Sequence, residues 1–146
     1  MNELDRRIIK DWLAILMGQI SGSEGQKDGA VDLKSCASAH YIALHMEETI
    51  KDLKGDLPRF IEFLEGKMNW VVRHDRQART ILADENKPDC VCPLSREGLL
   101  SDPALCECSR GFAEKMFGYV IGKKVEARIV ESILRKGTHC VYEVIY

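Results

Sequence analysis

The amino-acid sequence predicts an α+β domain in which helices come first and an antiparallel sheet follows. Helical apolar periodicity dominates as far as Gly66, short β-rich runs follow it, and one further helical pattern separates two predicted hairpins. Because helices and strands segregate along the chain instead of alternating, the strands should pair antiparallel. With 146 residues, the chain has the length of one domain, divided into a helical part (1–66) and a cysteine-rich α+β part (67–146).

Three helices are expected in the first part. Apolar residues at helical spacing predict an amphipathic helix over Leu4–Gln19, and a flexible loop rich in glycine and serine should follow over Ile20–Ala30. A short third helix should begin at Asp56–Pro58, where an N-cap residue precedes an early proline, and end at Gly66. Between them, Val31–Leu53 is predicted to be one continuous helix. Its apolar stripe consists of Ala39, Ile42, Ala43, Met46, Ile50 and Leu53.

The second part should open with a β-hairpin formed by Asn69–Arg73 and Arg79–Ala83. The charges that come next, Asp84 and Glu85 followed by Lys87, are expected to be solvated in a loop. After a cysteine-rich loop, a helix ending at Gly122 should turn one apolar face inward. Cys108 is expected to share that face, which carries Phe112, Ala113, Met116, Phe117 and Val120.

A final hairpin is expected from Lys124–Leu134 and His139–Tyr146. Strand alternation places Glu131 on the same face as the apolar residues around it, where its carboxylate needs a partner. If Lys136 and Gly137 form a two-residue loop, Glu131 pairs with Tyr142 and becomes a diagonal neighbour of Cys140.

Composition argues against two classes of partner. Lys and Arg number 21 and Asp and Glu 23, so the net charge is −2, and no basic block indicates nucleic-acid binding. The longest apolar run, Trp12–Met17, is too short to span a membrane, and the acidic Glu3 and Asp5 do not fit a signal peptide. We therefore expect a soluble cytoplasmic protein.

In a reducing cytosol its six cysteines are more typical of metal ligands, redox groups or buried thiols than of structural disulfides.

Two Cys-x-Cys pairs, Cys90/Cys92 and Cys106/Cys108, are the main candidate for chemistry. Thirteen residues rich in turn formers separate Cys92 from Cys106, so the loop can fold back and bring the pairs together. Zinc prefers four ligands and binds thiolates, so a zinc site is one hypothesis; reduced structural thiols and disulfide or redox chemistry are the others. The metal ligands would be a subset of Cys90, Cys92, Cys106, Cys108, Glu131 and Cys140.

Two further groups of residues have both a functional and a structural interpretation. Cys36 and His40 are one helical turn apart, so the imidazole can activate the thiol as a nucleophile, or both can simply pack at the helix edge. A set of aromatic residues either lines an apolar ligand pocket or belongs to the ordinary core. This set is Trp70, Phe112, Phe117, Tyr119 and Tyr142.

The sequence also resembles two known families. The run Cys108-Ser-Arg-Gly-Phe112, together with the later Glu131 and Cys140, resembles the C-terminal pattern of 4-vinyl reductase domains. That resemblance implies a small-molecule-binding or sensory module, often with zinc held by cysteines and a glutamate beside an apolar pocket. Cys108, Glu131 and Cys140 match the ligand pattern, whereas Leu134 stands where the family commonly has another cysteine. The paired Cys-x-Cys elements resemble a cysteine-rich bacterial group often labelled as similar to aminothiazoline-carboxylate hydrolases.

These observations lead to two expectations for function. The first is a sensor or carrier domain that binds a small apolar or amphipathic ligand, contains a zinc-type structural site and acts through a partner or as a homodimer. The alternative is a hydrolase of the aminothiazoline-carboxylate type that uses Cys36 and His40 or a metal-bound water. A pocket against the aromatic residues and Glu131 would favour the first, and a pocket beside Cys36 the second.

Overall fold

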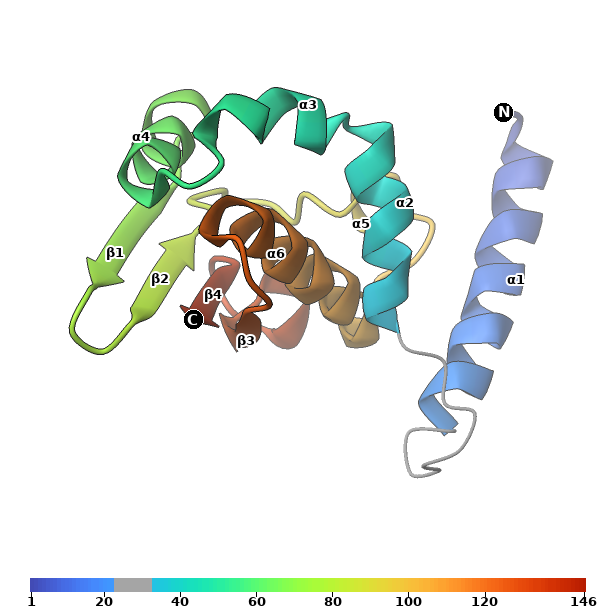
Figure 1. Ribbon diagram of the computed structural model, residues 1–146. Helices are drawn as coiled ribbons and strands as arrows, with labels where there is room; N and C mark the ends of the chain where they lie inside the picture. The colour runs from blue at the N-terminus through green and yellow to red at the C-terminus, as the bar shows by residue number, and fades with distance from the viewer. Residues whose placement is uncertain (23–32) are drawn as a thin grey trace.

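A computed structural model describes residues 1–22 and 33–146 and has the predicted α+β fold, with one four-stranded antiparallel sheet (Figure 1). The strand order is β1-β2-β4-β3. The strands are β1 (Val71–Asp75), β2 (Thr80–Asp84), β3 (Glu126–Glu131) and β4 (Val141–Ile145). The α-helices are α1 (Glu3–Gly22), α2 (Cys36–Ala43), α3 (Met46–Ile50), α4 (Leu57–Lys67), α5 (Pro93–Arg96) and α6 (Cys106–Ile121).

The main core lies between the sheet and the helices. Helix α6 packs against β3 and β4, and α2, α3 and α4 follow an arc over α6 (Figure 1). At the centre the rings of Phe60 and Phe117 meet edge to face, with 5.2 Å between their centroids. The largest fully buried side chains are Phe60, Phe117, Ile50, Leu64, Ile81, Met116, Val120 and Val144.

Helix α1 packs outside this core. Its Met17 is buried against Leu100 and Leu105 from the segment that precedes α6, whereas Leu4 and Leu16 are exposed. The helix begins one residue earlier than predicted and continues to Gly22, so the first three residues of the predicted loop are helical. The rest of that loop, residues 23–30, lies outside the described residues.

The prediction of one continuous helix from 31 to 53 is wrong. The chain turns between α2 and α3 at His45, whose backbone adopts the left-handed conformation with φ 49°. Helix α2 buries Ala37 and Tyr41, whereas the predicted stripe residues Ala39, Ile42 and Ala43 are exposed. The later members of the stripe, Met46, Ile50 and Leu53, are buried as expected. Residues 31 and 32 lie outside the described residues.

Helices α4 and α6 and the first hairpin follow the predictions, whereas the short helix α5 lies in the segment that was predicted to be a loop. The Asp56 side chain caps α4 by accepting a hydrogen bond from the Arg59 amide at 3.1 Å. Strands β1 and β2 pair antiparallel. Helix α6 ends at Gly122, whose φ of 83° suits a residue without a side chain. These elements depend on local apolar periodicity and capping, which can be seen in the sequence.

The predicted register of the last hairpin is wrong. Tyr142 pairs with Ile129, and a bulge between Ile129 and Glu131 then places Glu131 opposite Val141. The connection is longer than two residues because Ile133–Arg135 form a 3-10 turn and Lys136 adopts the left-handed conformation. The Gly137 amide closes this loop by donating to the Ser132 carbonyl at 2.8 Å.

No helix within residues 1–22 and 33–146 is long and apolar enough to cross a membrane.

Candidate ligand-binding site

A cavity of about 530 Å³ lies between the turn joining α2 and α3, the end of α4, the loop before α5, and α6. Small-molecule pockets typically measure about 300–1,000 Å³ and have mainly apolar walls with a few polar groups. The apolar part of the wall is formed by Leu44, Met46, Met68, Trp70, Phe112 and Ala113. The cavity therefore has both the size and the wall character of a site for one small organic molecule.

Glu85 is the buried acidic group of the cavity wall. Only 8% of the residue is exposed. Its amide donates to the Cys140 carbonyl at 3.0 Å, which continues the pairing of β2 with β4 beyond the strand end. Burial raises the pKa of its carboxyl to about 7, although a hydrogen bond from Tyr142 acts in the opposite direction. The expectation of a solvated charge at this position is wrong, and the carboxyl changes its protonation state near neutral pH.

Tyr142 connects Glu85 to α6. It lies on the central strand β4, paired with Ala83 on one side and Ile129 on the other. Burial raises the pKa of its hydroxyl, so the hydroxyl keeps its proton; a hydrogen bond with Ser109 acts in the opposite direction. Ser109, Tyr142 and Glu85 all line the cavity. They form a chain of polar groups along one side of a largely apolar wall.

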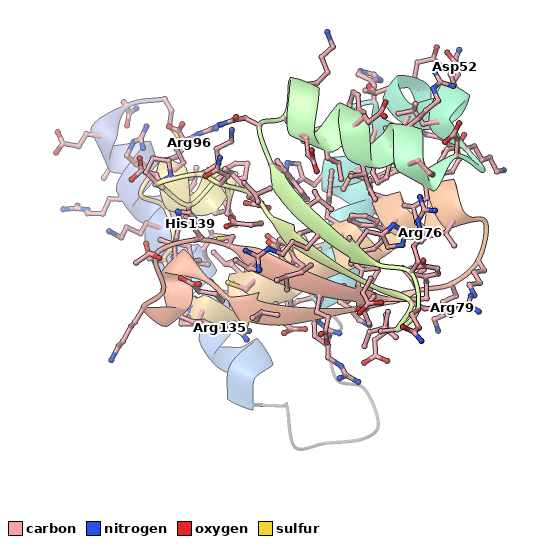
Figure 2. The ribbon with its side chains drawn as sticks, turned by 90° about the vertical axis from the view of Figure 1, so that its left-hand side faces the viewer. Asp52, Arg76, Arg79, Arg96, Arg135 and His139 are labelled. Carbon is pink, nitrogen blue, oxygen red and sulfur yellow. The ribbon has the colours of Figure 1, made fainter. Side chains whose placement is uncertain are left out.

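Positive charge is also part of the cavity lining. Lys67, Lys87 and Arg96 all contribute to it. The Lys87 ammonium donates to the Met68 carbonyl at 3.0 Å, so it is partly engaged in holding the α4–β1 turn. Lys67 and Arg96 are exposed, so their charges lie at the edge of the cavity and not in its depth. Arg96 at the end of α5 is labelled in Figure 2.

The structure brings together three of the five aromatic residues proposed for a pocket. Trp70, Phe112 and Tyr142 line the cavity. Phe117 is instead fully buried in the core. Tyr119 lies outside the cavity lining, where the Lys54 ammonium sits 5.2 Å from its ring centroid.

A close approach of backbones brings α2 beside Phe112. A Cβ atom at Gly111 would lie 2.8 Å from the Lys34 carbonyl oxygen, so glycine allows α6 to meet the turn that precedes α2. The His40 ring then lies 5.2 Å from the Phe112 ring, between centroids, and both residues line the cavity. Cys36, one turn earlier, is exposed and does not contribute to the lining.

The cysteines of the two Cys-x-Cys pairs do not share one environment. Cys92 and Cys108 line the cavity, whereas Cys106 is buried with its sulfur 2.9 Å from the Ser132 hydroxyl. Cys140 is also buried. Burial raises the pKa of the Cys108 and Cys140 thiols to about 11, so both are protonated at neutral pH. All six cysteines are free thiols.

Glu131 is occupied in holding the last loop and lies away from the cavity. Its carboxylate accepts hydrogen bonds from the Thr138 amide at 2.7 Å, the Thr138 hydroxyl at 2.9 Å and the His139 amide at 3.1 Å. These bonds lower the pKa of the Glu131 carboxyl, and the bond from the Thr138 amide has the largest effect. His139, labelled in Figure 2, pairs with Asp84 at 2.9 Å.

The described residues do not gather the donor set that a zinc site needs. Within residues 1–22 and 33–146, no group of three or more His, Cys, Asp and Glu side chains is arranged to hold a metal ion. Glu131, which matches the ligand pattern by position, is bound by loop donors instead.

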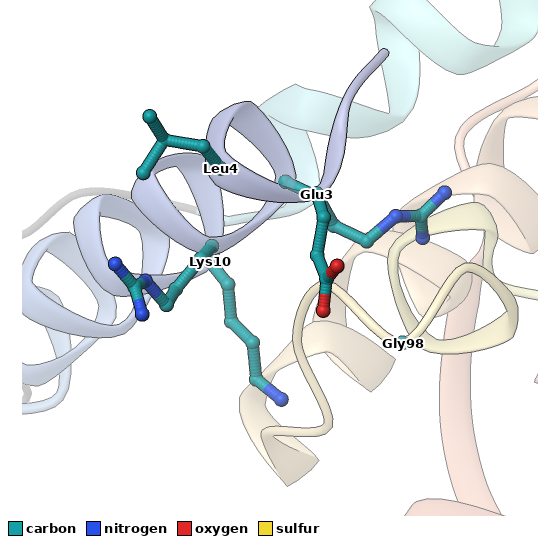
Figure 3. Close-up of a pocket in the computed structure, with 6 residues that line it drawn as sticks. Glu3, Leu4, Lys10 and Gly98 are labelled. Carbon is teal, nitrogen blue, oxygen red and sulfur yellow. The ribbon is translucent and has the colours of Figure 1, made fainter.

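A second hollow lies between α1 and the turn at Gly98 (Figure 3). Its lining is mostly charged, with Glu3, Arg6, Arg7 and Lys10 from one side of α1. The Arg6 guanidinium is used to join the two segments, because it donates to the Glu97 carbonyl at 2.6 Å. This hollow contains neither a buried polar group nor an aromatic wall, so the cavity around Glu85 is the better candidate site.

No protein-family model matches the sequence, and no curated protein is significantly similar to it. The resemblance to 4-vinyl reductase domains remains a prediction.

Proposed function

We propose that this protein binds a small amphipathic molecule in the cavity around Glu85 and acts as a sensor or carrier. The observation that supports this most strongly is the buried carboxyl of Glu85 in a wall whose neighbouring side chains include Trp70 and Phe112. Keeping a carboxyl there costs stability whenever it is charged, because burial removes its hydration. Perturbed titratable groups in clefts are typical of functional sites.

The lining suggests how a ligand would be held. Trp70, Phe112 and the neighbouring apolar side chains would remove the body of the ligand from water. The carboxyl of Glu85 can accept a hydrogen bond when charged and donate one when protonated, and Tyr142 and Ser109 add hydroxyls. A ligand would therefore be oriented by a polar group facing this side of the wall.

The state of the thiols supports binding more than covalent catalysis. Cys108 lines the cavity, but its raised pKa keeps the thiol protonated at neutral pH, and the thiolate is the nucleophilic form. His40 contacts the ring of Phe112, and Cys36 lies outside the lining. Cys108 is therefore not an activated nucleophile in the cavity wall.

The loop before α5 offers a route for a sensory output. Cys92 lines the cavity and also packs against the cluster that holds Met17 of α1. A ligand that moves this loop would therefore change how the loop packs against the cluster that holds α1. We propose this coupling as the way in which occupancy is reported to a partner.

The proposal predicts that a bulky residue in the wall prevents binding. Anilinonaphthalene sulfonate, a fluorescent dye with an apolar body, serves as the probe. Cys108→Phe, which adds a ring to the lining, should weaken dye binding about tenfold or more, a loss of about 1.4 kcal/mol or more. The measurement is a fluorescence titration, with circular dichroism to verify folding.

Cys36→Phe is the matched control, because it makes the same change at an exposed cysteine outside the lining. It should bind the dye like the unmodified protein. Equal dye binding by a folded Cys108→Phe variant would contradict the proposal.

A further inference from the structure

We infer that the ligand is an organic acid, whose anionic group is held at the edge of the cavity by Lys67 and Arg96 while its apolar body lies along Trp70 and Phe112. This inference rests on the proposed function and specifies its ligand class. It is supported by the charges around the cavity and by what each of them already contacts.

The two edge cations are available for a ligand. Neither Lys67 nor Arg96 forms an ion pair with any residue in the part of the chain that the structure describes. Arg110, Arg128 and Arg135, in contrast, are each paired with a glutamate. The guanidinium of Arg96 can bind a carboxylate through two parallel hydrogen bonds, and the Lys67 ammonium adds a second positive charge to the lining.

The acidic side chain of the cavity does not cancel these charges. Glu85 is the acidic residue in the lining, against Lys67, Lys87 and Arg96. Even with Glu85 ionised, the lining carries more positive than negative charge. An anion is thus favoured over a cation of the same shape.

The apolar wall defines the rest of the ligand. Trp70 is almost fully buried and Phe112 is half-buried, so the space beside them suits a flat or branched hydrocarbon body. A polyphosphate would leave this wall in contact with charged groups, which costs free energy. A monoanionic acid with a hydrophobic body would place its charge beside the cations at the edge and its apolar part against the wall.

Two dyes that share one apolar skeleton test the inference. Anilinonaphthalene sulfonate carries an anionic sulfonate, whereas phenylnaphthylamine is its neutral counterpart. We expect the sulfonate dye to bind at least about fivefold more tightly, and Lys67→Gln and Arg96→Gln each to weaken it about threefold to tenfold. Neither substitution should change the binding of the neutral dye.

Arg76→Gln is the control for loss of one positive charge. Arg76 is exposed in the β1–β2 turn, far from Arg96 in Figure 2, and does not line the cavity. It should leave the binding of both dyes unchanged.

The outcomes separate the two proposals. One outcome is that both dyes bind equally tightly, that Cys108→Phe weakens the binding of both, and that Lys67→Gln and Arg96→Gln change neither. In that case the ligand class is wrong and the binding function stands. If Cys108→Phe affects neither dye, the cavity is not the binding site and both proposals fail.

Discussion

Phe117→Ala is expected to lower the free energy of unfolding by about 3–5 kcal/mol, the usual cost of removing a fully buried phenylalanine. The Phe117 side chain has no exposed surface and packs edge to face on Phe60 in the centre of the core. Its removal would leave a cavity that the sheet and α4 cannot fill without moving. Urea denaturation followed by circular dichroism measures the loss.

Phe112→Ala is the matched control, because Phe112 lies five residues earlier on α6 but lines the cavity around Glu85. It should cost less stability, since the ring is half-buried, and it should weaken dye binding. The opposite pattern, in which Phe117→Ala is mild and Phe112→Ala severe, would show that the ring of Phe117, not that of Phe112, faces the cavity.

Glu85→Gln is expected to raise the free energy of unfolding by about 3 kcal/mol at pH 8 and to leave it nearly unchanged at pH 4. Burial raises the pKa of this carboxyl from its ordinary value of 4.5 to about 7 in the folded protein. The folded state therefore holds the proton more tightly than the unfolded state. Stability decreases as pH rises from about 4.5 to about 7, and the loss is complete above that range. Glutamine mimics the protonated form and does not titrate.

The test is a series of denaturation curves between pH 4 and pH 8. This pH range covers both the ordinary pKa of a glutamate carboxyl and the raised pKa of Glu85. Glu62→Gln provides the control, because Glu62 is exposed on α4. The Glu85→Gln difference should grow with pH while the control difference does not follow that pattern. A constant difference for Glu85→Gln would mean that the carboxyl is hydrated and that the cavity wall is not as described.

The parts of the fold that depend on neighbouring residues were predictable from the sequence. The cap at Asp56, the β1–β2 hairpin and the apolar face of α6 all depend on local patterns. The break at His45 was not predictable in the same way, because the left-handed conformation occurs there at a residue other than glycine. The register of β4 on β3 likewise depends on a bulge and a closed loop, which alternation alone does not reveal.

The site was predictable only in part. The sequence left open whether the aromatic residues line a pocket or belong to the core, and it grouped Phe112, which lines the cavity, with Phe117, which is buried in the core, on one apolar face of α6. Glu85 was missed although a signal exists. It continues the alternation of Ile81 and Ala83, both buried, so extending strand β2 by one residue places its carboxyl on the same inward face.

Energy transfer from Trp70 to bound anilinonaphthalene sulfonate tests the central claim most directly. Trp70 lines the cavity, and Trp12→Phe removes the other tryptophan of the sequence, so the emission then reports one position. A dye in the cavity would lie against the indole, so saturation with dye should quench nearly all Trp70 emission in the Trp12→Phe protein. If the dye saturates the protein and the Trp70 emission remains unchanged, the cavity around Glu85 is not the ligand site.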